Sequence, residues 1–356
     1  MDSSLFVALG CTFATFGPNT MNDVRVITVR PMLGLTYKIA IGKLGLTYKI
    51  AIGKSDDDPV SQGIASSDYE LPNSIQLMLA AIKPGSVVID IGAHIGTFAI
   101  PAAALGYHVI AVEASSRNVE LLRTSLSLNG FTNVQVVQAA VSDREGIVEF
   151  FEMGPYGGIV TPRGGGPTVS QVTAVTVDSL LASIGLKHVD FIKMDIEGSE
   201  VKAIHGMSDL LSQPEAPAIV YESNGHTLQM FNETPQSLIA ALDVFGYKSY
   251  LTQQKRLVPV EINDLQPECV VDYLAAKQLV GKWRDWVITS MTQEEQLSLL
   301  LVESCVSGGP NRAYVARTLA SANRSFLSDP RIRAALDRLC MDEDPTVRDA
   351  ASWWLG

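Results

Sequence analysis

The chain has 356 residues, of which 47% are hydrophobic and 18% charged, so it can bury a sizeable core and is not of the disordered class. Its formal net charge of −11 argues against nucleic acid as a partner, because phosphate binding needs clustered Lys and Arg. The four cysteines form no Cys-x-x-Cys pair, and the five histidines do not cluster near them. We therefore expect no metal site, a reduced cytoplasmic setting and, since the N-terminal apolar run is too short to span a bilayer, no membrane partner.

The N-terminal region contains one eleven-residue string twice. Residues 33–43 and 44–54 both read Leu-Gly-Leu-Thr-Tyr-Lys-Ile-Ala-Ile-Gly-Lys. Two copies are too few for a solenoid, and Thr, Tyr and Ile between glycines favour strands. We interpret the repeat as a tandem duplication that lengthens a β-hairpin or a loop; a duplicated contact surface is the alternative. Residues 1–65 are predicted to be an N-terminal extension.

From residue 73 onward, predicted helices and strands alternate. The strands are expected at 86–91, 108–113, 134–138, 147–151, 172–177, 189–194 and 218–222, with 247–251 and 257–262 closing the sheet. The helices are expected at 73–83, 95–105, 117–129, 199–211 and 235–246. Residues 154–167, rich in Gly and Pro, are predicted to be a loop. This alternation predicts a doubly wound α/β sheet within residues 66–265.

The alternation of predicted strands and helices ends at about residue 265, and we predict that residues 266–356 are an α-helical C-terminal region. Asp329-Pro330 and Asp344-Pro345 each place a proline at the first position of a helix. The Asp-Pro-x-x-Arg pattern that both segments share resembles HEAT-type repeats. The region is long enough for only about two such repeats, whereas a free-standing solenoid needs about three. The region is therefore expected to pack on the α/β domain, on a protein partner or on a second copy of the chain.

A glycine-rich turn follows the first predicted strand of the sheet. It reads Gly92-Ala93-His94-Ile95-Gly96, whereas a dinucleotide-binding turn reads G-x-G-x-x-G, so His94 stands where the central glycine would be. Asp90 precedes the turn, and its carboxylate would repel a phosphate. It suits a ligand that has a positive charge and no phosphate, such as S-adenosylmethionine with its sulfonium and ammonium groups.

Two further stretches fit a nucleoside-like ligand. Glu113 ends the next strand, where an acidic residue can accept hydrogen bonds from both ribose hydroxyls. A solvated carboxylate at a strand end is the alternative. The small residues of Ala139-Ala140 follow the third strand and would let the backbone approach an adenine ring, although a plain turn explains them equally well.

The strongest second signal is Lys-Met-Asp-Ile-Glu-Gly-Ser-Glu at 193–200. Asp195 and Glu197 follow a predicted buried strand, and ligands of open α/β sheets bind at the carboxyl ends of strands. Acids at such a position are destabilising unless they serve a cation, a hydrogen-bond network or a proton transfer. Lys193 is a candidate ion-pair partner for these acids. Glu200 is predicted to stabilise the helix dipole from the first turn of the next helix.

These stretches resemble the FkbM family of S-adenosylmethionine-dependent methyltransferases, over about residues 66–252. The resemblance is carried by Val-Ile-Asp-Ile-Gly-Ala-His-Ile-Gly at 88–96, by Asp-Ile-Glu-Gly at 195–198, and by 111–114, 139–143, 175–180 and 220–222. It implies the class I methyltransferase fold, a Rossmann-like sheet of seven strands with an antiparallel last pair. The family methylates hydroxyls of polyketides and sugars, and some relatives methylate nitrogen. His94 departs from the Asn that is common there, but both side chains can donate a hydrogen bond.

The resemblance also implies roles for individual residues. The cofactor-binding set would comprise Asp90, Gly92, Ala93, His94, Gly96, Glu113, Ala140 and Asp195. Within that set, Asp90, Gly92 and Gly96 would line the methionine end, Glu113 would hold the ribose, and Ala140 would lie against the adenine. An alcohol acceptor would also need a base to take its proton, and Asp195, Glu197 and His226 are the candidates. Residues 154–167 would be a substrate lid or a flexible connection.

Three hypotheses follow from the sequence. The first is O-methylation of a hydroxyl on a small molecule, polyketide or sugar with S-adenosylmethionine, with N-methylation of a peptide or amide as its alternative. The second is an NAD-type oxidoreductase, which Glu113 supports but Asp90 and the G-x-x-x-G spacing oppose. The third is an interaction scaffold that binds a partner through the C-terminal helices.

Overall fold

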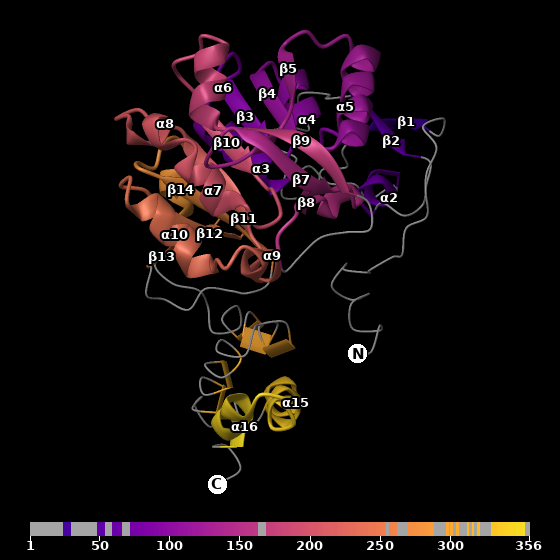
Figure 1. Cartoon of the computed structure of the whole chain (residues 1–356). Helices are drawn as coiled ribbons and strands as arrows, with labels where there is room; N and C mark the ends of the chain where they lie inside the picture. Colours follow the sequence, from indigo (N-terminus) through magenta and orange to yellow (C-terminus); the bar gives the residue numbers. More distant parts are fainter. Residues whose placement is uncertain are drawn as a thin grey trace.

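The computed structural model describes residues 24–29, 48–53, 59–65, 72–162, 169–253, 256–261, 270–287 and 329–352, with single positions between 297 and 320. Its centre is an eight-stranded sheet in the order β13-β12-β14-β11-β10-β3-β4-β5 (Figure 1). The strands are β3 (Val87–Ile91), β4 (His108–Glu113), β5 (Val134–Gln138), β10 (Phe191–Met194), β11 (Ala218–Ser223), β12 (Lys248–Gln253), β13 (Arg256–Val260) and β14 (Val271–Ala276). The predicted doubly wound α/β sheet is confirmed.

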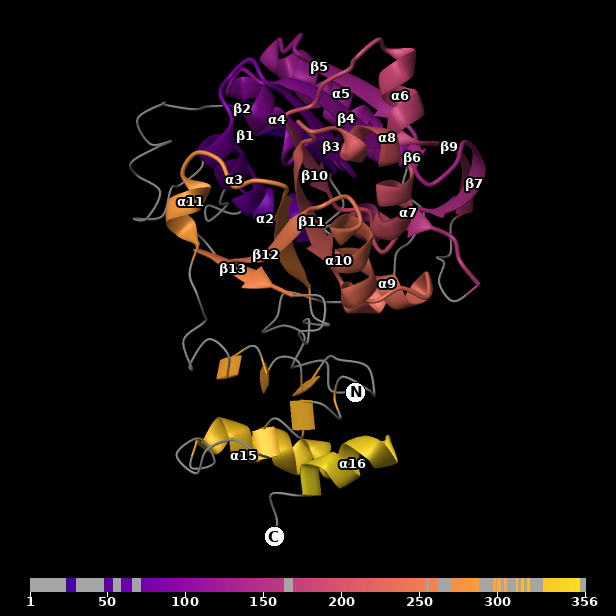
Figure 2. The same ribbon diagram turned by 90° about the vertical axis from the view of Figure 1, so that its left-hand side faces the viewer.

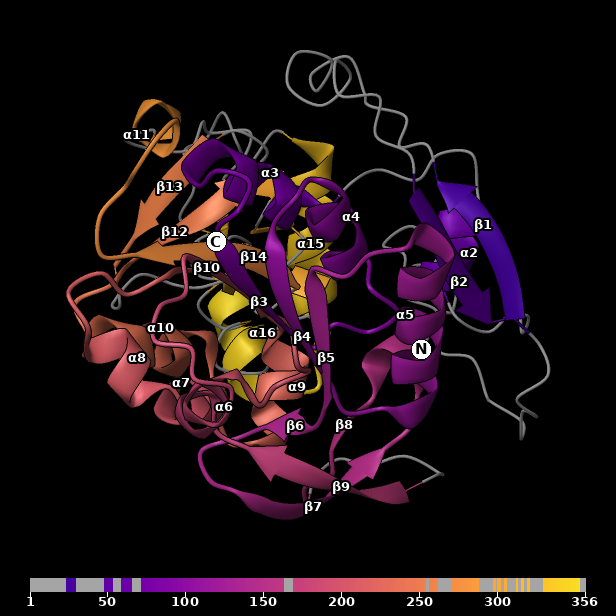
Figure 3. The ribbon, with the colours of Figure 1, turned by 90° about the horizontal axis from the view of Figure 1, so that it is seen from above.

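Helices cover both faces of this sheet (Figure 3). Side chains alternate along each strand, so Val88 belongs to one core cluster and its neighbour Ile89 to the other. The first cluster includes residues of α3 (Asn73–Ala81), α4 (Ala99–Ala104), α5 (Ser116–Asn129) and α11 (Trp283–Trp286). The second includes residues of α6 (Val177–Ser183), α7 (Glu200–His205), α8 (Ser208–Ser212) and α10 (Pro235–Asp243). Each fully buried Ile, Leu or Phe of these clusters contributes about 2 kcal/mol of hydrophobic stabilisation.

The edge of the sheet corrects the prediction of how it closes. We expected residues 247–251 and 257–262 to form the closing pair. Instead, β14 lies between β11 and β12 and runs antiparallel to both, while β13 is an added edge strand. Because β14 begins at Val271, the predicted boundary between residues 265 and 266 cuts through the sheet. Residues 271–276, which we had predicted to belong to an α-helical region, are thus a strand of the sheet.

Trp283 locks the segment after β14 onto the sheet. Its side chain is 0% exposed, its indole Nε1 donates to the Leu77 carbonyl oxygen at 3.0 Å, and its ring packs 6.4 Å from that of Phe191. We expect Trp283→Ala to lower the free energy of unfolding by about 4 kcal/mol, because it opens a cavity beside the sheet. Urea denaturation measures this loss, with the partly buried Trp286→Ala as the matched control. Equal losses in both variants would mean that this segment is not part of the core.

A smaller four-stranded sheet, in the order β6-β9-β7-β8, lies beside the carboxyl ends of the central strands (Figure 3). It consists of β6 (Ala140–Val141), β7 (Gly146–Phe151), β8 (Gly158–Ile159) and β9 (Val169–Val175). The predicted loop at 154–167 therefore contains a one-turn 3₁₀ helix, η1 (Gly154–Tyr156), and the short strand β8. Residues 163–168 of that prediction lie outside the described residues.

The N-terminal region contributes to the fold as well. β1 (Val24–Val29) pairs antiparallel with β2 (Tyr48–Gly53), which lies within the second copy of the repeat, as a lengthened hairpin would require. Ile50 and Ala51 of β2 are fully buried in the first core cluster. A short helix, α2 (Pro59–Ala65), follows. The first copy of the repeat, residues 33–43, lies outside the described residues.

The C-terminal helices α15 (Pro330–Leu339) and α16 (Pro345–Ser352) lie apart from the sheets (Figures 1 and 2). As predicted, a proline opens each helix after an aspartate, and the Asp329 side chain accepts the Arg331 backbone N–H at 2.8 Å. These helices have their own core cluster, which includes Ile332, Leu336 and Val347. The likeness to HEAT-type repeats stays a prediction. None of the helices in the described part of the chain is long and apolar enough to cross a bilayer.

Candidate active site

A pocket lies at the carboxyl ends of β3, β4, β5 and β10, under the small sheet. Six of the predicted site residues line it: Gly92, His94, Glu113, Ala140, Asp195 and Glu197. The opposite wall is formed by Phe150 of β7, by Gly157 just before β8, and by Ile159 of β8. Since the carboxyl ends of parallel strands meet at one edge, residues far apart in the sequence converge here.

The backbone N–H groups of the glycine turn are hydrogen-bonded within the protein. The N–H groups of Gly92 and Ala93 both donate to the Val112 carbonyl oxygen, at 2.9 and 3.0 Å, and that of Gly96 donates to the Ala93 carbonyl at 2.8 Å. These donors are therefore already engaged and cannot form a cradle for a pyrophosphate. Gly92 has a φ of +77°, and a Cβ there would overlap the Asp195 carbonyl oxygen, so only glycine fits.

Glu113 joins the glycine turn to the start of α5. One carboxylate oxygen accepts the His94 N–H at 2.8 Å, and the other accepts the Ser115 N–H at 2.9 Å and the Asn118 side-chain amide at 3.3 Å. The carboxylate is nearly buried yet lines the pocket. Each oxygen has two lone pairs, so at least one acceptor position remains for a ligand hydroxyl. The alternative of a solvated carboxylate at a strand end does not fit this geometry.

Beneath the turn, Lys193 lies between two aspartates. Its ammonium nitrogen lies 3.5 Å from Asp90 Oδ1 and 3.5 Å from Asp195 Oδ2, and it donates to the Gly92 carbonyl oxygen at 2.9 Å. The register of β3 and β10 places Asp90 directly beside Lys193. Asp90 is 0% exposed, whereas Asp195 is 37% exposed toward the pocket. Lys193 thus pairs with both acids and holds the glycine turn against β10.

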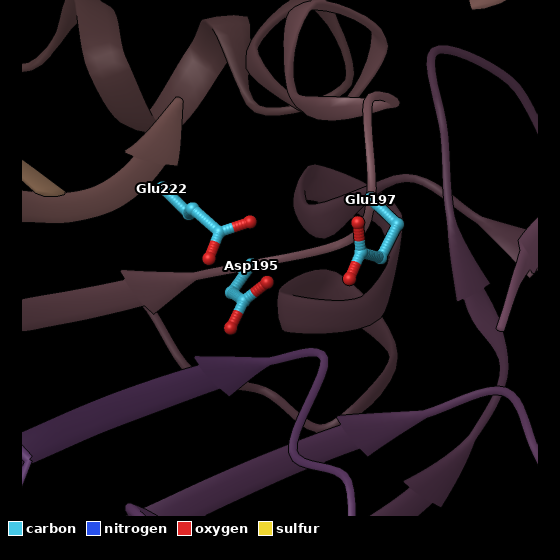
Figure 4. Close-up of side chains that lie close together, drawn as sticks. All are labelled: Asp195, Glu197 and Glu222. Atoms are coloured by element: carbon cyan, nitrogen blue, oxygen red, sulfur yellow. The ribbon is translucent and has the colours of Figure 1, made fainter. Parts of the chain in front are cut away.

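Three carboxylates from two neighbouring strands lie together, and two of them, Asp195 and Glu197, line the pocket. Asp195 and Glu197 follow β10, and Glu222 is the second-last residue of β11; one oxygen from each lies within 4.8 Å of the others (Figure 4). The backbone of Glu197 has a φ of +54°, and that of His94 a φ of +50°. Both residues line the pocket, and such sparsely populated conformations of non-glycine residues cluster at functional sites.

Burial and the charges of neighbouring acids raise the pKa values of Glu197 and Glu222. Burial first, and then the charges of Asp195 and Glu200, raise the pKa of Glu197 to about 8 against the opposing charge of Lys193. Burial, Asp195, Glu197 and the cross-strand neighbour Asp272 raise the pKa of Glu222 well above its usual range. Burial disfavours the charged form of Lys193. The negative charges of Asp195, Asp90 and Glu222 outweigh this effect, so the pKa of Lys193 is raised.

Glu200 has a structural position, as predicted. It lies in the first turn of α7 and is 2% exposed. One of its carboxylate oxygens accepts the N–H groups of Ile196 and Gly198, at 3.1 and 3.3 Å, and so fixes the turn that carries Glu197. Burial raises the pKa of Glu200 to about 7 despite these hydrogen bonds.

Four predicted site residues do not reach the pocket surface. His226 is exposed on α9 (Gly225–Met230), where its N–H is held by the Asn224 side chain, so it does not lie with the other candidate bases. Ala93 is buried in the core. Gly96 is required for packing, because a Cβ would come within 2.7 Å of Ile100 and Leu122 side chains. Asp90 lies below the surface and acts through Lys193.

Glu222 was not predicted to be a site residue, although residues 220–222 carried part of the resemblance. The signal was available: Glu222 is an acid at the carboxyl end of a buried parallel strand, as Asp195 is. Asp195, Glu197 and Glu222 are also the described residues that could hold a metal ion together. Three carboxylates supply oxygen ligands of the type that Ca²⁺ or Mg²⁺ takes, but fewer than the six or more that such ions need, so waters or a ligand would complete the shell.

The strand order and the site together define a class I methyltransferase fold. Five parallel strands in the order β5-β4-β3-β10-β11 are followed by β14 and β12, and of these two strands only β14 is antiparallel to the five. The pocket lies between β3 and β10, the point at which the strand order reverses. The family comparison is specific: residues 90–249 match the methyltransferase FkbM domain. These residues therefore match a methyltransferase domain, and the protein is a methyltransferase.

Comparison with solved structures gives weaker similarities. The precorrin-6y C5,15-methyltransferase from Geobacter metallireducens GS-15 is 15% identical, with 58% of this chain and 87% of that chain covered and a TM-score of 0.34. A T. thermophilus 16S rRNA methyltransferase in complex with AdoMet and guanosine is 13% identical, with 73% and 52% covered and a TM-score of 0.37. A ribosomal protein L11 methylase from Lactobacillus delbrueckii subsp. bulgaricus is 14% identical, with 58% and 77% covered and a TM-score of 0.34. No curated protein matches the chain.

Proposed function

We propose that this methyltransferase transfers the methyl group of S-adenosylmethionine to a hydroxyl of a small molecule, polyketide or sugar. The observation that carries the proposal is Glu197, a pocket carboxylate whose pKa burial raises to about 8. A general base works best when its pKa lies near the working pH, and Glu197 meets that condition. Its carboxylate lies with those of Asp195 and Glu222, each with one oxygen within 4.8 Å of the others.

The residues of the pocket fit S-adenosylmethionine, a donor that supplies an electrophilic methyl group on a sulfonium. Neither carboxylate oxygen of Asp90 accepts a hydrogen bond from the described residues, and the ion pair with Lys193 is long at 3.5 Å. Asp90, Lys193 and Asp195 together carry one net negative charge at the methionine end, which favours a cationic ligand. Glu113 offers acceptor positions for ribose hydroxyls, and Ala140 leaves room for an adenine.

The chain's own residues would then act on the acceptor. Glu197 would take the proton of the acceptor hydroxyl, and S-adenosylmethionine would supply the methyl group that this oxygen receives and would depart as a neutral thioether. Phe150 and Ile159 of the small sheet exclude water from this edge. Holding the acceptor in line with the reacting carbon supplies much of the rate, because the displacement is geometrically demanding.

A labelled-methyl screen tests the proposal. The purified chain is incubated with S-adenosylmethionine labelled in the methyl group and with panels of sugars, polyketides, amines and peptides. We expect label to appear on a hydroxyl compound as an ether that survives mild acid and base. Transfer to nitrogen alone would replace the proposal by N-methylation, and NADH-dependent turnover without label transfer would favour an oxidoreductase.

A further inference from the structure

One wall of the pocket comes from outside the matched domain. The FkbM match begins at residue 90, yet Val60 of α2 lines the pocket together with His94 and Thr97. The sequence assigned this residue to an N-terminal extension without a functional role. The position of Val60 therefore needs an explanation that the domain itself does not provide.

Helix α2 is anchored so that Val60 faces inward. Ile64, four residues later, is 3% exposed and belongs to the core cluster that also holds Ala93 and Ile95 of the glycine turn. Residues four apart lie on the same face of a helix, so burying Ile64 directs Val60 toward the same side. Gln62, between them, is exposed.

The strand before α2 is held as firmly. The Ala51 N–H donates to Ser125 Oγ at 2.9 Å, the Lys49 N–H donates to Asn129 Oδ1 at 2.8 Å, and the Asn129 amide donates back to the Lys49 carbonyl at 2.7 Å. Ser125 and Asn129 belong to α5, whose first turns hold the Asn118 amide against Glu113. One helix thus fixes both the N-terminal strand and the ribose end of the pocket.

From these contacts we infer that Val60 is a specificity-determining residue of the methyl-donor pocket, and that the N-terminal segment completes this pocket. The inference rests on the proposed use of S-adenosylmethionine. An isopropyl group at position 60 leaves space beside His94 and Thr97, where the glycine turn faces the ligand. The larger indole in its place would reduce the space of this pocket, and it would leave the side chains of Asp90, Glu113 and Asp195 unaltered in identity.

Calorimetric titration of the full chain with S-adenosylhomocysteine, the demethylated donor, tests the inference. We expect Val60→Trp to weaken binding at least tenfold, and Gln62→Trp, the same change on the exposed face of α2, to leave binding within twofold of the wild type. If the wild type binds and both tryptophan variants bind equally well, Val60 is not a pocket residue, and the proposed function stands. If the wild type itself does not bind, the proposed function fails.

Thermal melting would reveal whether Val60→Trp misfolds. A second variant, Val60→Ala, tests the inference in that case. Val60→Ala removes two methyl groups without adding bulk, and we expect it to weaken S-adenosylhomocysteine binding by about threefold to tenfold through lost apolar contact. An affinity of Val60→Ala equal to that of the wild type would overturn the inference, whatever the tryptophan variant does.

Discussion

Asp90→Ala is expected to weaken the binding of S-adenosylhomocysteine and S-adenosylmethionine at least 100-fold. Two effects act together. The substitution removes the buried negative charge nearest the methionine end, and it leaves Lys193, which holds the Gly92 carbonyl, with Asp195 as its remaining ion-pair partner among the described residues. Removing one partner of a buried ion pair costs about 3–5 kcal/mol, so the variant should also melt at a lower temperature.

Two controls separate charge from folding in this experiment. Asp90→Asn keeps the shape of the side chain and is expected to lose nearly as much affinity as Asp90→Ala. Asp243→Asn removes an exposed carboxylate whose pairing with Lys248 is at 4.0 Å, and it should bind as the wild type does. Calorimetry on the folded proteins measures all three. Affinity of Asp90→Ala within threefold of the wild type would refute the assigned role.

The affinity of the wild type should itself depend on pH. Burial raises the pKa of Asp90 to about 6, against the charge of Lys193. Asp90 is therefore largely ionised at pH 7, and we expect S-adenosylmethionine binding to weaken as the pH falls through about 6. The same titration with Asp90→Asn should be flat over that range.

Glu197→Gln is expected to lower kcat by about 100-fold to 10,000-fold on the acceptor that the labelling screen identifies, because it removes the proposed general base. Its affinity for S-adenosylhomocysteine should change little, since the side chain lies at the acceptor end of the pocket. In the wild type, kcat/KM should rise with pH through about 8, where Glu197 ionises, and the variant should lack this rise. A full rise in the variant would assign the base to another group.

Stability gives an independent readout of the same carboxyl group. Its folded-state pKa is raised from 4.5 to about 8, so the neutral form favours folding. The stability that this contributes is complete below about pH 4.5 and is lost as the pH rises through 8. We therefore expect Glu197→Gln to lose less stability than the wild type between pH 5 and pH 8.5, by about 2–4 kcal/mol. Urea denaturation at the two pH values checks the sign.

Much of the site was predictable because it depends on local patterns. A buried strand followed by acids and a glycine placed Asp195 and Glu197 at the edge of the sheet, where they line the pocket. Asp90, predicted beside them, lies within β3 below the pocket and pairs with Lys193. Lys193 was expected to pair with one acid and pairs with two, because the strand register sets Asp90 beside it. Such register is a tertiary property, since it depends on which strands become neighbours.

The predictions that were wrong or incomplete concern features that depend on contacts between residues far apart in the sequence. β14 lies between β11 and β12 through pairing that no local pattern encodes, and the sequence assigned it to the α-helical region at 266–356. His226 follows a strand end closely, but the Asn224 cap begins a helix that carries it to the surface. Glu222 was overlooked although it is an acid near the carboxyl end of a buried strand; only the tertiary fold places it beside Asp195 and Asp272.

The central claim is that the pocket binds a sulfonium nucleoside and not a dinucleotide. Parallel titrations of the wild-type chain test it most directly: S-adenosylhomocysteine by calorimetry, and NADH by its fluorescence. We predict one S-adenosylhomocysteine bound per chain with micromolar affinity, and no NADH binding, because the N–H groups of Gly92 and Ala93 are engaged by Val112 and Asp90 repels phosphate. NADH binding of comparable strength, or no binding of S-adenosylhomocysteine, would contradict the claim.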